Sequence, residues 1–249
     1  MKRTKKQILA EIRSIKSDSS NYTESVIRED PYSLVAKKVL EKVPHSTVFE
    51  GKSFKEVRAI VKPALMTVLY NSKQEPINVF GEDTPELEAF YTALHELFPG
   101  ALNVMEALNN RWDNTATYHE FVMPDGHVAH VKVIEAVDGT LDNEGLNLPY
   151  RYKVNQASTN GTSIVANFTH ACDAFIIRYV VDNADFQVAH IHDAIGFHPN
   201  NGSKVRELYK EAFAVLSKSK VLEEFCEQDF GIDNNDFLNG LKTSSYALC

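Results

Sequence analysis

The sequence predicts an α+β fold that is mainly helical, with antiparallel hairpins in its second half. Before residue 117, apolar residues recur at spacings of three and four, which is typical of amphipathic helices. After it, short apolar runs alternate with turn signals at Asp125-Gly126 and Asp138-Gly139, which favours antiparallel strands. The sequence shows no internal repeat and no clear linker, so we expect one cooperative body.

The first half contains five helical patterns, over residues 4–17, 30–43, 53–70, 84–98 and 101–112. Ser53 precedes the third pattern, and Glu56 follows three residues later, as in a capping box. Pro63 lies inside that segment and should kink it, because proline has no N–H for the carbonyl four residues earlier. Thr84 and Pro85 have the residue types preferred at an N-cap and a first helical position.

The second half alternates strands and helices. Strands are expected within residues 115–141, a loop over 155–163 and a helix over 163–181. Two short strands, 186–191 and 194–198, follow with His192-Asp193 at the turn between them. Residues 202–230 predict a long amphipathic helix or a helix pair.

Composition limits the function classes. A formal net charge of -8 argues against binding nucleic acid through overall electrostatics, so any such binding must be local. The N-terminal cluster of basic residues is most simply a solvated helix face. Three cysteines without CxxC spacing, Cys172, Cys226 and Cys249, indicate neither a disulfide framework nor a zinc site. No secretory signal or membrane-spanning apolar run is evident, so we expect a cytoplasmic protein.

A stripe of functional side chains is predicted on the segment 53–70. Arg58, Lys62, Met66 and Tyr70 recur every four residues and therefore share one helix face. The two cations could hold a triphosphate, and the ring could pack against a sugar or a base. The alternative is a surface helix whose cations lie over a core-facing Met and Tyr, and spacing alone favours it.

The stretch HIHDAIGF, residues 190–197, sets ionisable groups into an apolar run. We expect Asp193 to be partly desolvated at a tight turn, an arrangement that suits magnesium. A zinc cluster of His190, His192 and His198 is the alternative, and a turn aspartate with two satisfied histidines is a third reading. His170 and Asp173, one helical turn apart, could also face a ligand together, although such pairs are usually structural.

These segments together resemble the C-terminal part of the single-subunit, phage and mitochondrial-type DNA-dependent RNA polymerases. The family's motif B, Arg-x3-Lys-x3-Met-Thr-x2-Tyr-Gly, is matched from Arg58 to Tyr70, and the His-Asp of motif C by His192-Asp193. NFTHACD, residues 167–173, matches Asn-Phe-x-His-x2-Asp. DPYSLVA at 30–36 and the tail LKTSSYALC at 241–249 add two further matches in the family's order. Family A DNA polymerases share part of motif B, but their motif C reads His-Asp-Glu, whereas Ala194 follows Asp193 here.

The resemblance implies a right-hand polymerase fold with fingers and palm portions, the palm carrying the β-hairpin. It implies that Asp193 binds two magnesium ions and that Arg58 and Lys62 bind the triphosphate, Lys62 as electrostatic stabiliser and candidate acid. Tyr70 and His170 would sense the ribose 2′-hydroxyl. Further matched positions are Met66 at the substrate and, in supporting roles, His192, Asn167, Asp173 and Gly196.

The sequence also departs from the family pattern, and these departures limit what the resemblance implies. Asn71 replaces the glycine after Tyr70, and asparagine tolerates the left-handed backbone such a turn needs. No residue within 1–29 resembles the second metal-binding aspartate, motif A, so this chain alone should be inactive. The implied chain is the smaller half of a split polymerase, as in the heterodimeric RNA polymerases of some phages. The alternatives are an inactive remnant, a DNA polymerase fragment or a histidine-metal hydrolase.

The implied organisation has a partner-contacting basic helix at 1–29, fingers at 30–170 and palm at 171–249. Partners would be a subunit carrying motif A, across an interface that includes residues 7–43, together with DNA template, RNA product and ribonucleoside triphosphates. The family's promoter-reading hairpin corresponds here to VDGTLDNEG, residues 137–145, with Asp138, Asp142 and Glu144 and no cation. We expect it to repel phosphates, so that templates arrive single-stranded or through an accessory factor that binds single-stranded DNA or recruits the promoter.

Overall fold

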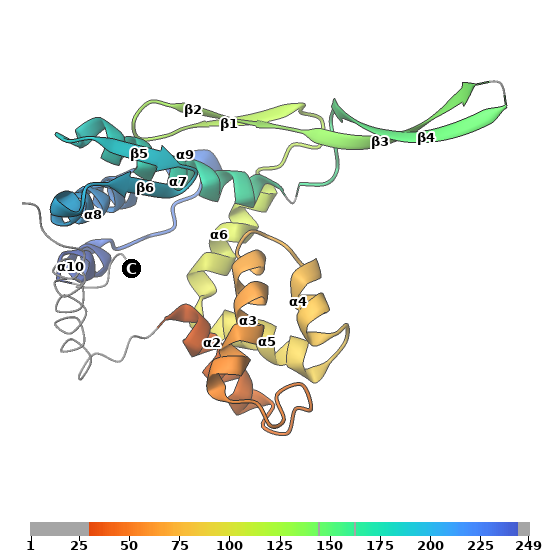
Figure 1. The fold of residues 1–249 in the computed structure, drawn as a ribbon, viewed down its shortest axis with the longest axis horizontal. Coiled ribbons are helices and arrows are strands. Elements are labelled where there is room, and N and C mark those ends of the chain that lie inside the picture. Colours follow the sequence, from red (N-terminus) through yellow and green to blue (C-terminus); the bar gives the residue numbers. More distant parts are fainter. Residues whose placement is uncertain (1–29, 144, 162, 244–249) are drawn as a thin grey trace, which may run out of the picture.

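The computed structural model describes residues 30–143, 145–161 and 163–243, and the chain combines helices with short antiparallel hairpins (Figure 1). The predicted helix at 4–17, the basic segment 1–29 and residues 244–249 of the tail lie outside the described residues. The helices are α2 (Pro31–Lys42), α3 (Phe54–Val68), α4 (Gln74–Phe80), α5 (Pro85–Leu97), α6 (Pro99–Asn110), α7 (Ser163–Asn183), α8 (Gly202–Lys218), α9 (Val221–Cys226) and α10 (Asn235–Thr243).

Helices α2 to α5 pack around a first hydrophobic core and form one lobe (Figure 1). Val35, Val61, Leu65 and Phe90 are fully buried in it, each at the three- or four-residue spacing that predicts its helix. The caps agree with the sequence. Ser53 and Glu56 form the predicted capping box of α3, and the Thr84 hydroxyl accepts the Leu87 N–H at the start of α5.

In this lobe, one helix was not predicted, and the predicted kink in another is not tested. Helix α4 was not predicted, because its seven residues, QEPINVF, are too few for a period to be recognised. Helix α3 continues through Pro63 to Val68, and the Thr67 hydroxyl donates to the Pro63 carbonyl over 2.8 Å. The kink at Pro63 stays a prediction.

A second core lies between α6, α7, α8, α9 and the β1–β2 hairpin. Its apolar residues include Phe121, Phe168 and Phe225, whose rings contact one another at centroid distances of 5.0 to 5.9 Å. The predicted boundary between residues 170 and 171 lies within helix α7 and stays a prediction. The two cores meet where α5 leads into α6.

Helix α7 supplies the centre of the second core. Among the described residues it is the one helix long and apolar enough, by length and composition, to cross a membrane. Seven of its apolar residues are buried against the rest of the chain: Ile164, Val165, Phe168, Phe175, Ile176, Ile177 and Val180. This burial is that of a core helix.

Three separate antiparallel hairpins complete the described fold: β1 (Tyr118–Val122) with β2 (Val128–Lys132), β3 (Ile134–Asn143) with β4 (Leu146–Asn155), and β5 (Val188–Ile191) with β6 (Ala194–Phe197). The predicted turn at Asp125-Gly126 is confirmed between β1 and β2, where Gly126 has φ +79°. The predicted loop between β4 and α7 and the predicted turn at His192-Asp193 are also found.

The predicted turn at Asp138-Gly139 is wrong. Both residues lie within β3, opposite Arg151 and Tyr150 of β4, and the chain reverses between Asn143 and Leu146 instead. Gly139 leaves room for the ring of Tyr150 on the paired strand, because a Cβ at position 139 would come within 2.6 Å of that ring. The Asp138 carboxylate accepts two hydrogen bonds from Arg151, so the paired strand does place a cation beside it.

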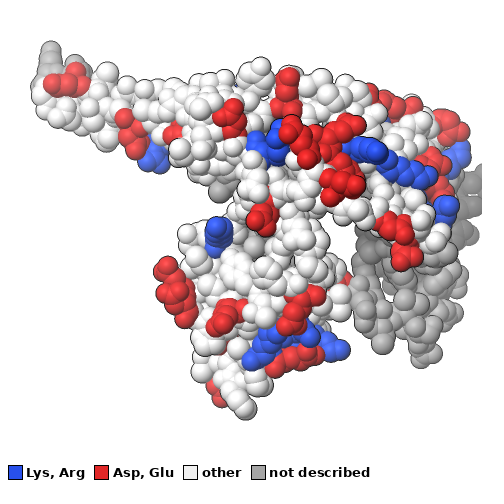
Figure 2. Space-filling model, turned by 180° about the vertical axis from the view of Figure 1, so that it is seen from behind, with Lys and Arg blue, Asp and Glu red and all other residues white. Residues whose placement is uncertain are grey.

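The β3–β4 hairpin projects beyond the helices as an arm (Figure 1). Residues two apart share a face, which places Leu141, Leu148, Tyr150 and Tyr152 on one side of the ribbon, all at least 44% exposed. Figure 2 shows the arm as largely uncharged from behind, with acidic side chains gathered over the body.

Candidate functional site

A cleft of about 490 Å³ lies at the junction of the two cores. Three distant segments line it: the end of α3, the middle of α7 and the β5–β6 turn. The lining residues are Tyr70, His170, Asp173, Ala174, Ile177, His192 and Asp193. Five of these seven residues were singled out in the sequence as Tyr70, His170, Asp173, His192 and Asp193.

Tyr70 is held by the turn that ends α3. Asn71 has φ 68°, so the prediction that asparagine adopts the left-handed turn in place of glycine is confirmed. The Asn71 N–H donates to the Val68 carbonyl over 2.9 Å, and the Ser72 N–H donates to the Thr67 carbonyl over 3.0 Å. The Asn71 and Asn109 amides donate to each other over 2.8 and 3.4 Å, which ties the turn to α6.

The Tyr70 ring contacts the His170 ring across the cleft, with centroids 5.4 Å apart and an interplanar angle of 41°. Burial raises the pKa of Tyr70, and the negative charges of Asp173 and Asp193 raise it further. The hydroxyl therefore keeps its proton at neutral pH and can donate a hydrogen bond to a ligand.

Two carboxylates share the cleft. Partial burial of its carboxyl raises the pKa of Asp173, although much of the residue is exposed. The charge of His170 opposes this shift, and the charge of Asp193 adds to it. Among the residues that the structure describes, none makes a hydrogen bond or ion pair with Asp193. The cleft thus brings two carboxylates together from α7 and the β5–β6 turn.

Asp193 is more exposed than the sequence suggested. His190, His192, Asp193 and Ala194 are all exposed, and Ile191 is 74% exposed. The expectation of partial desolvation was wrong because nothing among the described residues covers this face of the β5–β6 ribbon. His192 has φ 56°, a left-handed conformation that non-glycine residues seldom adopt, and such strain concentrates at functional sites.

Arg58 and Lys62 do not line the cleft. Lys62 lies eight residues before Tyr70, about 12 Å along the helix, and Arg58 one turn further, about 18 Å away. Both cations lie over the Tyr32 ring of α2 at 5.4 Å from its centroid. Arg58 also forms an ion pair with Asp30, with 3.2 Å between Nη2 and Oδ2.

The remaining predicted site residues have ordinary environments. Met66 is 43% exposed between Lys62 and Tyr70, so it does not face the core as the alternative interpretation of the stripe required. Asn167 donates to the Ser163 carbonyl one turn earlier in α7. Gly196 pairs with Ala189, and a Cβ there would meet the Ala189 carbonyl at 3.4 Å, so the strand tolerates a larger residue with only a small adjustment.

The zinc interpretation finds no geometric support in the described part of the chain. His190, His192 and His198 do not converge, and no group of three or more His, Cys, Asp or Glu side chains there could hold a metal ion. His198 instead accepts the Asn200 N–H at the start of a short 3-10 helix.

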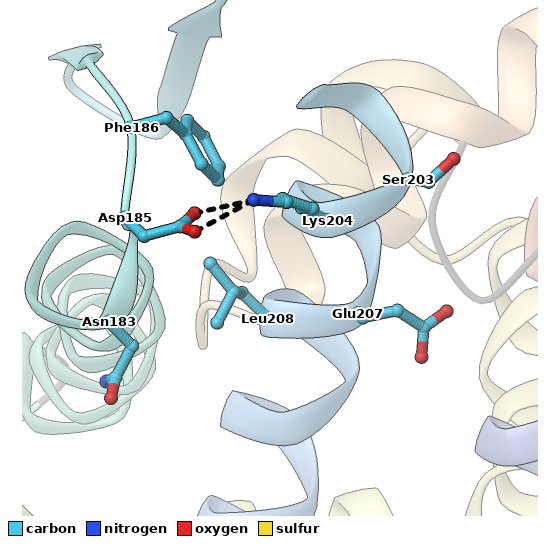
Figure 3. A pocket seen from close by; sticks show the side chains of 7 residues that line it. All are labelled: Asn183, Asp185, Phe186, Ser203, Lys204, Glu207 and Leu208. Atoms are coloured by element: carbon cyan, nitrogen blue, oxygen red, sulfur yellow. Dashed lines mark hydrogen bonds and ion pairs between the residues drawn. The ribbon is translucent and has the colours of Figure 1, made fainter. Parts of the chain in front are cut away.

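A second hollow, of about 380 Å³, lies between the α7–β5 loop and α8 (Figure 3). Lys204 donates to both oxygens of Asp185 over 2.9 and 2.8 Å and lies 5.6 Å from the Phe186 ring centroid. Figure 3 shows the ammonium pointing at that carboxylate. The pair joins the loop to the helix at the surface, where both side chains are exposed and an ion pair contributes little to stability.

Several contacts near the site escaped sequence reasoning. Tyr209 of α8 lies close enough to Asp193 that, after burial, this charge raises its pKa. Ala174 and Ile177 line the cleft from α7, and Asp30 and Tyr32 contact the α3 cations. No local signal marks these residues, because each contact joins segments far apart in the chain.

Comparison with models of protein families gives no match, and comparison with curated proteins gives none either.

Proposed function

We propose that the chain is a subunit of a DNA-dependent RNA polymerase and transfers ribonucleotides by a two-magnesium mechanism. A partner chain would complete the site with the second aspartate. The proposed fold is the fingers and C-terminal palm portion of a right-hand polymerase.

One observation carries the proposal. Tyr70 ends the motif B match, His170 belongs to the NFTHACD match and Asp193 to the motif C match, yet all three line one cleft. About 120 residues separate Tyr70 from Asp193 in the chain, so the sequence matches alone did not require this meeting. Unrelated surface residues would have no reason to converge in this way.

The residues of the cleft and those of α3 would have separate roles in the proposed reaction. Lys62 is spaced from Tyr70 by a distance of the order of an extended nucleoside triphosphate, with the ribose near Tyr70 and the phosphates toward Lys62 and Arg58. The Tyr70 hydroxyl keeps its proton and can hydrogen-bond the 2′-hydroxyl, with His170 packed against its ring. Lys62 would stabilise the negative charge that develops on the leaving pyrophosphate.

The Asp193 carboxylate is a type of ligand that suits magnesium, but one carboxylate is too few for two ions. Its exposed carboxylate is a hard oxygen ligand on a fixed hairpin turn, as magnesium prefers. Bound magnesium would favour ionisation of the primer 3′-hydroxyl and neutralise phosphate charge. A single aspartate cannot hold and space two ions, which is why the proposal requires a partner.

The surface around Asp193 supports an obligate partner. Ile191 and Phe197 of the β5–β6 ribbon and Met66 of α3 are large apolar side chains left at least 39% exposed. The β5–β6 ribbon is two-stranded, and its edges are free to pair within the described part of the chain. A partner strand beside β5–β6 would cover this surface and bring the missing carboxylate close.

The test is ribonucleotide incorporation on single-stranded DNA by the chain assembled with the candidate partner encoded by the neighbouring gene. We expect Asp193→Asn to lower the rate at least about 1000-fold, with folding unchanged because the side chain is exposed. Asp185→Asn, which removes an exposed carboxylate outside the cleft, is the control and should keep the wild-type rate. Incorporation by the Asp193→Asn complex at the wild-type rate refutes the proposal.

A further inference from the structure

We propose that Asp30 is a positioning residue for polyphosphate binding, holding Arg58 so that one edge of its guanidinium group faces the triphosphate. This inference rests on the proposed function. It concerns the first residue that the structure describes, at the start of α2, whose partner Arg58 precedes Tyr70 by about 18 Å of helix.

The Asp30 carboxylate is itself fixed. It caps α2, with Oδ1 accepting the Ser33 N–H over 2.9 Å and Oδ2 accepting the Ser33 hydroxyl over 3.0 Å. An N-cap carboxylate held at both oxygens has little rotational freedom. Whatever it binds is therefore held in a defined orientation relative to α2.

Asp30 occupies one edge of Arg58. Nε of Arg58 donates toward Oδ1 and Oδ2 over 3.3 and 3.2 Å, and Nη2 lies 3.2 Å from Oδ2. A guanidinium group has a second edge, formed by Nη1 and the outer N–H of Nη2, that can bind a phosphate bidentately. That edge makes no hydrogen bond with any described residue, and the Arg58 side chain is 35% exposed.

The Tyr32 ring aligns the two cations. It follows Asp30 by two residues and lies 5.4 Å from both Arg58 Cζ and Lys62 Nζ, so α2 holds cations from successive turns of α3 on one ring. Lys62 has no acidic partner in the described part of the chain. The charges of Asp30, Arg58 and Lys62 sum to a net positive charge beside the start of α2.

Glu96 forms an ion pair of the same kind outside the proposed site. Glu96 of α5 pairs with Lys38 and Lys42 of α2 at 3.2 and 2.5 Å, joins two helices and contacts no residue of the proposed site. Asp30 likewise joins two helices, but its cation belongs to the motif B match. Glu96 is therefore a matched control for a carboxylate that only fastens α2 to its neighbour.

The experiment measures steady-state kinetics of the assembled enzyme with Asp30→Asn, since asparagine caps a helix as well as aspartate does. We expect KM for ribonucleoside triphosphates to rise about 5- to 30-fold with kcat within about twofold, because Arg58 must then be ordered by the substrate. In an Arg58→Ala background the same substitution should add less than about twofold. Glu96→Gln should leave both constants unchanged.

An unchanged or lower KM in Asp30→Asn overturns the inference, as does an undiminished effect in the Arg58→Ala background. Calorimetric titration of the full chain with inorganic tripolyphosphate separates this inference from the proposed function. If the assembled chain incorporates no ribonucleotide but tripolyphosphate binding weakens at least fivefold in Asp30→Asn, the polymerase proposal fails and the inference stands. If tripolyphosphate binding is absent or insensitive to Asp30→Asn in that case, both fail.

Discussion

The two ends of the proposed site differ in how firmly the chain holds them. At the phosphate end, Arg58 is fastened by Asp30 and Ser33 and lies with Lys62 over one tyrosine ring. At the metal end, Asp193 sits on an exposed two-residue turn, with no hydrogen bond from any residue the structure describes.

This difference indicates which half of the chemistry the chain can organise alone. Ordered cations can bind a polyphosphate without help, whereas a lone exposed carboxylate needs further ligands before it binds magnesium well. Triphosphate binding by the isolated chain, without turnover, is the expected behaviour.

The largest expected effect distinguishes Lys62 from an ordinary ring-stacked lysine. Under the proposed function, Lys62→Ala should lower kcat/KM of the assembled enzyme about 100- to 1000-fold, because it would remove the charge that stabilises the leaving pyrophosphate. Lys204→Ala is the control, since Lys204 also lies over an aromatic ring but is on α8, outside the motif B match. Equal, small effects of the two substitutions would show that Lys62 has no role in binding or reacting with the triphosphate.

The turn that positions Tyr70 should show the next largest effect. Asn71→Ala loses the paired amides with Asn109 and places alanine at positive φ, so we expect unfolding free energy to fall by about 1–3 kcal/mol. Asn71→Gly relieves the φ and should cost less than the alanine variant. Urea denaturation measures both, and a glycine variant less stable than the alanine variant would contradict the role given to the left-handed turn.

A smaller effect concerns sugar discrimination at the Tyr70–His170 contact. Tyr70→Phe keeps the ring and removes the hydroxyl, so preference for ribonucleotides over deoxyribonucleotides should fall about tenfold while the ribonucleotide rate changes little. The ratio of kcat/KM values measures this preference. Tyr91→Phe, another partly buried tyrosine but in the first core, should leave the ratio unchanged.

The smallest effect is a pH dependence at the phosphate end. Burial raises the pKa of Asp30, but hydrogen bonds from the Ser33 N–H, Arg58 and the Ser33 hydroxyl outweigh it, so the pKa lies below the ordinary 3.8. A carboxyl with a lowered pKa stabilises the fold above its unfolded value and loses that contribution as pH falls through the folded value. The stability difference between wild type and Asp30→Asn should therefore shrink below about pH 4, and a difference that grows on acidification would contradict this assignment.

Much of the local structure followed from residue patterns, because caps and periods act over a few residues. Ser53, Glu56, Thr84 and Asn71 each took the predicted conformation. Asp138-Gly139 misled because glycine has two uses, as a turn residue and as room for a cross-strand ring. A local pattern cannot separate the two, since the Tyr150 ring comes from the other strand.

The site was only partly predictable for the same reason. Residue types and spacing pointed to Tyr70, His170 and Asp193, but the exposure of Asp193 depends on which segments fail to cover the hairpin. The contact between Asp30 and Arg58 joins residues 28 positions apart in two packed helices. Such contacts follow from packing, which pattern and propensity do not specify.

The arm formed by β3 and β4 has a practical consequence. Its ladder runs from the Ile134–Asn155 pair to the Asn143–Leu146 pair and contributes no side chain to the cleft or to either core beyond its base. Replacing residues 137–152 by a short turn, or inserting an epitope near the tip, should therefore leave the body of the protein intact. The arm is therefore a site at which the chain can be immobilised or labelled while the cleft stays free.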